Sequence, residues 1–188
     1  IHKRVISKVS NKSVIAVGRL AWQKGFDYLI DSWALVAIKY PQWHLDIYGD
    51  GPDRFMLQQQ IDKCGLCDKI SLCGVTEHIE KEYGEHSLYV MTSRAEGFPL
   101  ALLEASACGL PLVSFNCPQG PNEIINNGEN GFLVNTVGDI VSLSEYICKL
   151  IEDDELRVAM GQKAKEYSNR FDENRIKTDW INLIEQLA

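Results

Sequence analysis

The feature that most constrains the fold of this chain is a regular alternation of short β-branched runs with longer segments of helical periodicity. The short runs predict strands at 14–17, 44–48, 69–73, 87–92, 112–115 and 131–134. The longer segments predict helices at 26–40, 52–65, 78–83, 99–108, 121–126, 139–152, 155–170 and 172–187. Proline near the start and glycine near the end of several helices support these boundaries.

This alternation implies a fold class. Strands that are separated by helices and joined by short connections form a parallel sheet with helices on both faces, a doubly wound α/β fold. In such sheets, ligands bind outside the carboxyl ends of the strands. The candidate ligand contacts are therefore the residues directly after the strands: Gly18 and Arg19, Gly49 and Asp50, Gly74 and Val75, residues 93–97 and residues 116–120.

Length and charge exclude several classes of function. The 188 residues are enough for one sizeable core, and their net charge is −7. An acidic chain has no general attraction for nucleic acid or anionic lipid, so we expect no nucleic-acid partner. No apolar run approaches the ~20 residues that span a bilayer, and residues 1–12 have no signal-peptide core. The expected location is the cytoplasm, with peripheral attachment to the inner face of the membrane left open for a longer protein.

The cysteines and histidines argue against a metal or redox site. Most of the six cysteines lie in or beside apolar stretches, as reduced core thiols do. Cys64-Gly-Leu-Cys67 has the spacing of a metal or redox pair, but no second pair follows, and its glycine is typical of a helix C-cap. The four histidines have no ligand spacing, and no Asp-x-Asp pair is present. We therefore expect no bound metal.

Residues 94–111 contain two carboxylates eight positions apart, Glu96 and Glu104. Glu104 interrupts an otherwise apolar predicted helix, where an unpaired carboxylate costs several kcal/mol or more. It is therefore expected to face a polar ligand or pocket, with Glu96 on roughly the same face. Gly97 permits close approach of a ligand to the backbone, and the start of a helix favours anions or hydroxyl oxygens. The alternative is a capping role for Glu96 and a paired, structural Glu104.

A second segment, Gly18-Arg-Leu-Ala-Trp-Gln-Lys24-Gly25, places two cations after the first predicted strand. Arginine and lysine commonly hold phosphate oxygens, although loop cations are more often simply solvated. The spacing is not that of a P-loop. Arg54 stands where the last glycine of Gly-x-Gly-x-x-Gly belongs, so a nicotinamide cofactor is poorly supported. The loop and short helix at 117–125 are either a plain turn or another wall of the same crevice.

With these segments in view, the chain resembles the nucleotide-binding C-terminal domain of retaining glycosyltransferases of the GT-B fold. The resemblance is to the glycosyl transferases group 1 family, which carries a Glu-x7-Glu motif. Glu96 and Glu104 match that motif, and residues 18–25, 48–52, 121–125 and 127–134 match other family elements in the same order. The resemblance runs from about residue 13 to the C-terminus and implies a Rossmann-like doubly wound sheet.

The resemblance also implies roles for individual residues. Arg19, Lys24 and Glu96 would be catalytic, with the two cations on the donor diphosphate and Glu96 on the donor sugar. Glu104 would bind the ribose hydroxyls, and Gly74 and Val75 would flank the base. The backbone of Gly97, Phe98 and Leu100 would bind the sugar and its phosphate. Gly18 would also contact the donor. Residues 116–120 depart from the commoner diglycine version of their loop. No cofactor or metal is implied beyond the nucleotide sugar itself.

The implied activity is transfer of a hexose-type sugar from a nucleoside diphosphate sugar, with UDP expected, to a glycan or lipid-linked acceptor in surface polysaccharide synthesis. Residues 1–12 would be a residual interdomain segment and residues 13–188 the donor domain. The acceptor-binding N-terminal domain would be absent, and the fragment alone inactive. The alternatives are another GT-B enzyme, such as a nucleotide-sugar epimerase or a phosphorylase, and a non-catalytic nucleotide-binding or regulatory module.

Overall fold

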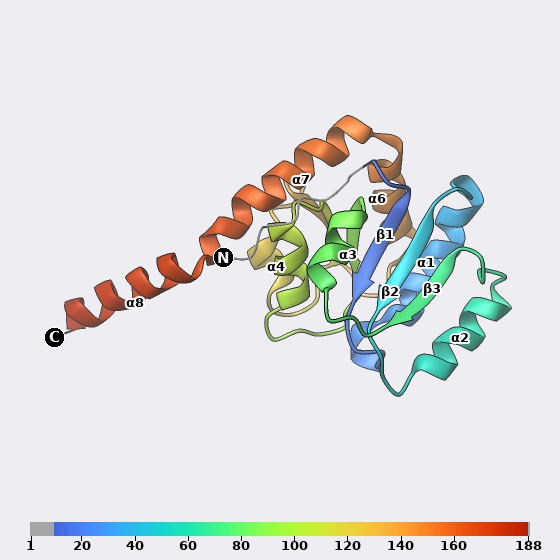
Figure 1. Cartoon of the computed structure of the whole chain (residues 1–188), viewed down its shortest axis with the longest axis horizontal. Helices are drawn as coiled ribbons and strands as arrows, with labels where there is room; N and C mark the ends of the chain where they lie inside the picture. The colour runs from blue at the N-terminus through green and yellow to red at the C-terminus, as the bar shows by residue number, and fades with distance from the viewer. Residues whose placement is uncertain (1–9, 188) are drawn as a thin grey trace.

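The computed structural model describes residues 10–187. Six strands form one parallel sheet in the order β3-β2-β1-β4-β5-β6. Figure 1 shows β3, β2 and β1 side by side. The strands are β1 (Ser13–Val17), β2 (His44–Tyr48), β3 (Ile70–Gly74), β4 (Leu88–Met91), β5 (Leu112–Phe115) and β6 (Gly131–Val134). The predicted doubly wound parallel fold is confirmed.

The helices fall where the periodicity predicts them, with shifts of one or two residues at their ends. They are α1 (Phe26–Lys39), α2 (Arg54–Lys63), α3 (Ile79–Glu85), α4 (Leu100–Ala107), α5 (Pro121–Ile124), α6 (Ile140–Glu152), α7 (Asp154–Ser168) and α8 (Glu173–Leu187). Two short 3-10 helices, η1 (Trp22–Lys24) and η2 (Asn169–Phe171), are additional to the prediction. Pro52 is not in the first turn of α2 as expected, because the chain turns at residues 52–53 and Asp53 is the N-cap.

Alternate side chains of the strands feed two separate cores. Val14 and Ala16 of β1 join a cluster with residues of α1, α2 and α6, whereas Ile15 joins a cluster with residues of α3, α4 and α7 on the other face. Strands β4, β5 and β6 are buried along their whole length, as expected for a parallel sheet that is covered on both faces. Trp33 and Phe115 are fully buried, and burial of one such side chain stabilises the fold by about 1.5 to 3 kcal/mol.

The strand order reverses between β1 and β4, which are neighbours in the sheet. The chain moves outward from β1 through β2 to β3, and then returns to the other side of β1 at β4. The loops that leave β1 and β4 therefore diverge at this position and open a crevice above the carboxyl ends of the strands. The predicted site residues are concentrated on these two loops.

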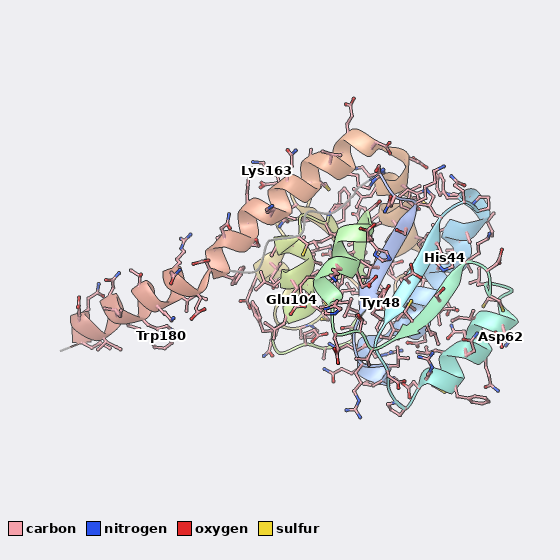
Figure 2. All side chains as sticks on the ribbon, viewed as in Figure 1. His44, Tyr48, Asp62, Glu104, Lys163 and Trp180 are labelled. Carbon is pink, nitrogen blue, oxygen red and sulfur yellow. The ribbon has the colours of Figure 1, made fainter. Side chains whose placement is uncertain are left out.

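Helix α8 projects away from the body of the domain (Figure 1). Its large apolar side chains, including Ile176, Trp180 and Ile184, are exposed, and Trp180 is labelled on the projecting part in Figure 2. The earlier helices differ, since each of α1 to α7 buries residues against the sheet or a neighbouring helix.

The cysteines and the turn after α2 bear on two expectations from the sequence. Cys108, Cys117 and Cys148 are buried, but the other three cysteines are exposed, so the prediction of mostly core thiols was wrong for half of them. Gly65 follows α2 with a left-handed φ of 68°, which confirms its predicted C-cap role. Residues 1–9, which make up most of the segment interpreted as an interdomain remnant, lie outside the described residues.

Candidate functional site

A cavity of about 340 Å³ lies at the carboxyl ends of β1, β2 and β3. Its lining comes from the last residues of β1 and β2, from the loops after the three strands and from two helices: Val17, Gly18, Arg19, Tyr48, Gly49, Asp50, Val75, Thr76, Ile79 and Glu104. Four of the site residues predicted from the sequence therefore line the same cavity: Gly18, Arg19, Val75 and Glu104.

The floor of this cavity is built by two backbones in close contact. The Gly18 N–H donates to the Tyr48 carbonyl at 3.0 Å, and the Leu20 N–H donates to the Asp50 carbonyl at 3.0 Å. Gly49 has a φ of 137°, and a Cβ at this position would lie 1.9 Å from the Gly18 carbonyl oxygen. Only glycine fits there, so the turn after β2 is fixed by its contact with the turn after β1.

Arg19 is exposed beside the cavity, and its side chain makes no hydrogen bond or ion pair with any residue in the part of the chain that the structure describes. Its guanidinium thus retains five N–H donors for a ligand. Val75 is also unusually open for an apolar side chain, with 79% of its surface exposed at the cavity wall. Gly74 precedes it with a φ of 79°, which turns the chain at the end of β3.

Glu104 reaches the cavity from α4, and Figure 2 shows it beside α3. The Tyr83 hydroxyl of α3 donates to Glu104 Oε2 at 3.2 Å and lies 3.3 Å from the Ala101 carbonyl oxygen. Burial raises the pKa of the Glu104 carboxyl, and the Glu80 charge adds to this, while the Tyr83 hydrogen bond opposes it. The second oxygen of Glu104 has no hydrogen-bond partner among residues 10–187, so the carboxylate is oriented by one hydrogen bond and keeps acceptor sites for a ligand.

Lys24 and Glu96 form an ion pair next to the cavity rather than in its lining. Lys24 Nζ lies 2.7 Å from Glu96 Oε1, which also accepts a 2.5 Å hydrogen bond from Ser93 Oγ. The Lys24 stem runs beside Gly18, since a Cβ on that glycine would lie 3.3 Å from Lys24 Cδ. The ammonium therefore sits between the cavity floor and the loop after β4.

Glu96 and Glu104 were expected on roughly the same face, but helical periodicity does not relate them. Helix α4 begins at Leu100 with Pro99 as its N-cap, so Glu96 lies in the preceding loop and not on the helix. The Glu96 side chain is 8% exposed and contacts the Lys24 ammonium, whereas the Glu104 side chain faces α3 and the cavity.

The backbone before α4 is open. The N–H groups of Gly97 and Phe98 have no hydrogen-bond partner among the described residues, whereas the Leu100 N–H donates to the Phe98 carbonyl. No atom lies within 4 Å of the position that a Gly97 Cβ would take, so neither packing nor a left-handed φ requires glycine there. The ring of Phe98 packs against Phe171 at 5.5 Å between centroids, which leaves its backbone as the group free to bind.

The loop at residues 116–120 and helix α5 do not line this cavity. Gln119 and Gly120 have consecutive positive φ values of 65° and 100°. Two glycines in a row would adopt this backbone without strain. A Gly120 Cβ would lie 2.3 Å from Pro99 Cδ, so the loop packs against the start of α4. Residues 122, 123, 125 and 126 line a separate cavity of about 530 Å³ with residues 167, 170 and 171.

Several cavity residues were given no role in donor binding or catalysis from the sequence. Tyr48 is the last residue of β2, and Gly49 and Asp50 follow it; the strand-end rule pointed to these two positions but not to Tyr48. Ile79 of α3 lines the cavity and Tyr83, one turn later on the same face, holds Glu104. Their helical spacing was visible in the sequence, but the contact of α3 with α4 was not.

Among residues 10–187, no group of three histidine, cysteine or acidic side chains is arranged to hold a metal ion. Within the same residues, no helix is long and apolar enough to cross a membrane.

Comparison with known proteins places most of the chain in one family. The family model described as glycosyl transferases group 1 matches residues 1–167. The chain is 38% identical over 183 residues to an exopolysaccharide phosphotransferase of Streptomyces coelicolor, covering 97% of this chain and 19% of the relative. It is 32% identical over 180 residues to the amylovoran biosynthesis glycosyltransferase AmsD of Erwinia amylovora, covering 96% and 50%.

A solved structure agrees with this placement. The pneumococcal O-GlcNAc transferase GtfA, in complex with UDP and GlcNAc, is similar with a TM-score of 0.87 and 30% identity, over 99% of this chain and 38% of that one. The chain therefore spans about half or less of the length of these three proteins.

Proposed function

The chain belongs to the glycosyl transferases group 1 family, and we propose that it binds the sugar donor of a retaining glycosyltransferase. The donor is a hexose-type sugar linked to UDP, and the acceptor is a glycan or a lipid-linked glycan in polysaccharide synthesis. The observation that carries the proposal is the cavity at the end of β1, β2 and β3, where unpaired Arg19 and oriented Glu104 meet in one space.

Each part of a nucleoside diphosphate has a fitting group in or beside this cavity. The exposed Val75 side chain offers an apolar contact to the base, and the Gly74 backbone offers hydrogen-bonding groups beside it. Glu104 accepts hydrogen bonds from the ribose hydroxyls. Arg19 and Lys24 bind the diphosphate, and the free N–H groups of residues 97 and 98 add donors near its sugar end.

The same groups serve the transfer step. Breaking the bond between sugar and diphosphate leaves negative charge on the phosphate oxygens, and preorganised cations that face this charge lower the barrier. The Lys24 ammonium has three donors, so it binds phosphate while retaining Glu96. Glu96 positions the sugar hydroxyls, and the acceptor attacks the face from which the diphosphate leaves, which retains the anomeric configuration.

The relatives and the cysteines support the context of this proposal. The GtfA structure contains UDP and GlcNAc, and AmsD is named for polysaccharide biosynthesis. All six cysteines are unpaired, as in proteins of a reducing compartment such as the cytoplasm. Because a GT-B enzyme binds its acceptor with a second domain, we propose that this domain alone binds donor without transferring the sugar.

A thermal-shift panel with UDP, GDP, ADP and UMP tests the proposal. At 100 times its dissociation constant, a ligand that binds only the folded state stabilises it by about 2.7 kcal/mol, which raises the midpoint by roughly 5 to 11 °C in a domain of this size. We expect UDP to give the largest shift and Arg19→Ala to reduce it. Arg175→Ala, an exposed change on α8, is the matched control and leaves the shift unchanged. The absence of a shift with every diphosphate would contradict donor binding.

A further inference from the structure

Arg94 lies in the loop after β4, and several contacts hold its guanidinium in place. Its two terminal nitrogens bind the two oxygens of Asp27 at 2.9 and 2.6 Å, and Nη1 also donates to the Trp22 carbonyl at 2.5 Å. The guanidinium carbon lies 4.1 Å from the centre of the Tyr28 ring and 4.8 Å from that of the Trp22 ring. Only 12% of the Arg94 side chain is exposed.

All these contacts connect the loop after β4 to η1 and the first turn of α1. The Arg94 N–H donates to the Gln23 carbonyl at 2.8 Å, and Gln23 Nε2 donates to the Ala95 carbonyl at 2.8 Å. Thr92 Oγ1 donates to the Lys24 carbonyl at 3.1 Å. The short helix η1 is thus fastened on both sides of Lys24 to the strand-end loop that carries Glu96.

The turn has little stability of its own. A three-residue 3-10 helix has poorly aligned hydrogen bonds, and η1 buries none of its residues. Trp22 is 71% exposed, so its contact with Arg94 is not held in place by a surrounding core. The position of the Lys24 ammonium, at the end of a flexible four-carbon stem, therefore depends on the contacts that fix the backbone of η1.

We propose that Arg94 is a positioning residue: by clamping Trp22 and Asp27, it holds Lys24 where its ammonium meets the donor diphosphate. This inference rests on the proposed function, because it assigns that ligand to Lys24. Arg94 itself does not line the cavity and is not a catalytic residue. Lysine can replace it only in part, since a point charge pairs with Asp27 but makes neither the two-pronged contact with its carboxylate nor the planar stacking on Tyr28.

A double-mutant cycle on UDP affinity, measured by titration calorimetry, tests the clamp. Lys24→Ala weakens UDP binding by about 5-fold to 150-fold, the range for loss of a hydrogen bond to a charged group. Arg94→Met is expected to cause a loss of similar size but no larger, and Arg94→Lys to give only partial rescue. In the Lys24→Ala background, Arg94→Met adds less than about a twofold loss, because the group it positions is gone.

A second readout separates positioning from general damage. The affinity for uridine, which has no phosphate, is expected to change less than about twofold in Arg94→Met. Arg157 is the matched control, since it also stacks on an aromatic ring, Trp43, and binds a carboxylate, Asp154, and backbone carbonyls, but it does not line the donor cavity. Arg157→Met is expected to destabilise the fold without a change in UDP affinity.

The outcomes are distinguishable. Full UDP affinity in Arg94→Met, equal losses for UDP and uridine, or independent multiplying losses in the double variant would each overturn the clamp. If Arg94→Met does not fold, Asp27→Asn removes the ion pair with little change of shape and is expected to show the same pattern with a smaller loss. A chain that does not bind UDP before any substitution would overturn the proposed function, and the clamp with it.

Discussion

Replacing Gly25 with alanine puts a methyl group into the contact between the two loops of the site. Gly25 has a φ of 64°, and its Cβ would lie 2.1 Å from the Thr92 carbonyl oxygen and 3.0 Å from the Thr92 carbonyl carbon. The left-handed backbone costs a non-glycine residue about 1 to 2 kcal/mol. Relief of the clash requires a backbone shift, and overpacking of this kind typically costs about 1 to 3 kcal/mol more. The expected loss of stability is thus about 2 to 5 kcal/mol.

Gly65→Ala is the matched control for this substitution. Gly65 has nearly the same backbone, with a φ of 68°, but no atom lies within 4 Å of its Cβ position. Only the conformational cost of about 1 to 2 kcal/mol then applies. Urea unfolding followed by circular dichroism measures both variants, with the slope checked for constancy. Equal losses in the two variants would refute the tight contact between Gly25 and Thr92.

Three further predictions concern the cavity, the sheet and α8. Because burial raises the pKa of Glu104 above 4.5, UDP affinity should fall with decreasing pH earlier than for an ordinary glutamate, and calorimetry of Glu104→Gln should lose this dependence. For Asp46, burial opposes ionisation, but the His86 hydrogen bond and the charges of two histidines lower its pKa below 3.8. Its stabilisation is therefore present above pH ~4 and lost as pH falls through the folded-state pKa, so acid unfolding of Asp46→Asn should be less steep; an unchanged profile would contradict the pairing. Removal of residues 173–187 should cost less than about 1 kcal/mol of stability, because the described side chains of α8 are exposed, and a larger loss in urea unfolding would show that α8 packs on the domain.

The fold could be predicted from the sequence because its signals are local. Runs such as residues 14–17 and 112–115, punctuated by glycine and proline, carry their own strand tendency, and their alternation with helices leaves few topologies. Errors occurred at ends where local signals compete. Pro52 resembles a first-turn proline, yet the turn at residues 52–53 delays α2 to Arg54.

The site could be predicted only in part, because much of it depends on distant contacts. The strand-end rule led to Gly18, Arg19 and Val75, which do line the cavity. The pairing of Lys24 with Glu96, 72 positions apart, has no local signal, since it follows from the adjacency of β1 and β4. The eight-residue spacing suggested roughly one face for the two glutamates, but Glu96 precedes both the predicted and the observed start of α4, so helical periodicity does not apply to it.

Calorimetric titration of UDP into the unaltered chain, Arg19→Ala and Lys24→Ala tests the central claim most directly. We expect saturable one-to-one binding by the unaltered chain and an affinity about 5-fold to 150-fold weaker in each variant, since each loses a charged donor to the diphosphate. Absence of binding, or equal affinity in all three proteins, would contradict the claim that this cavity and the adjacent Lys24 hold a nucleoside diphosphate.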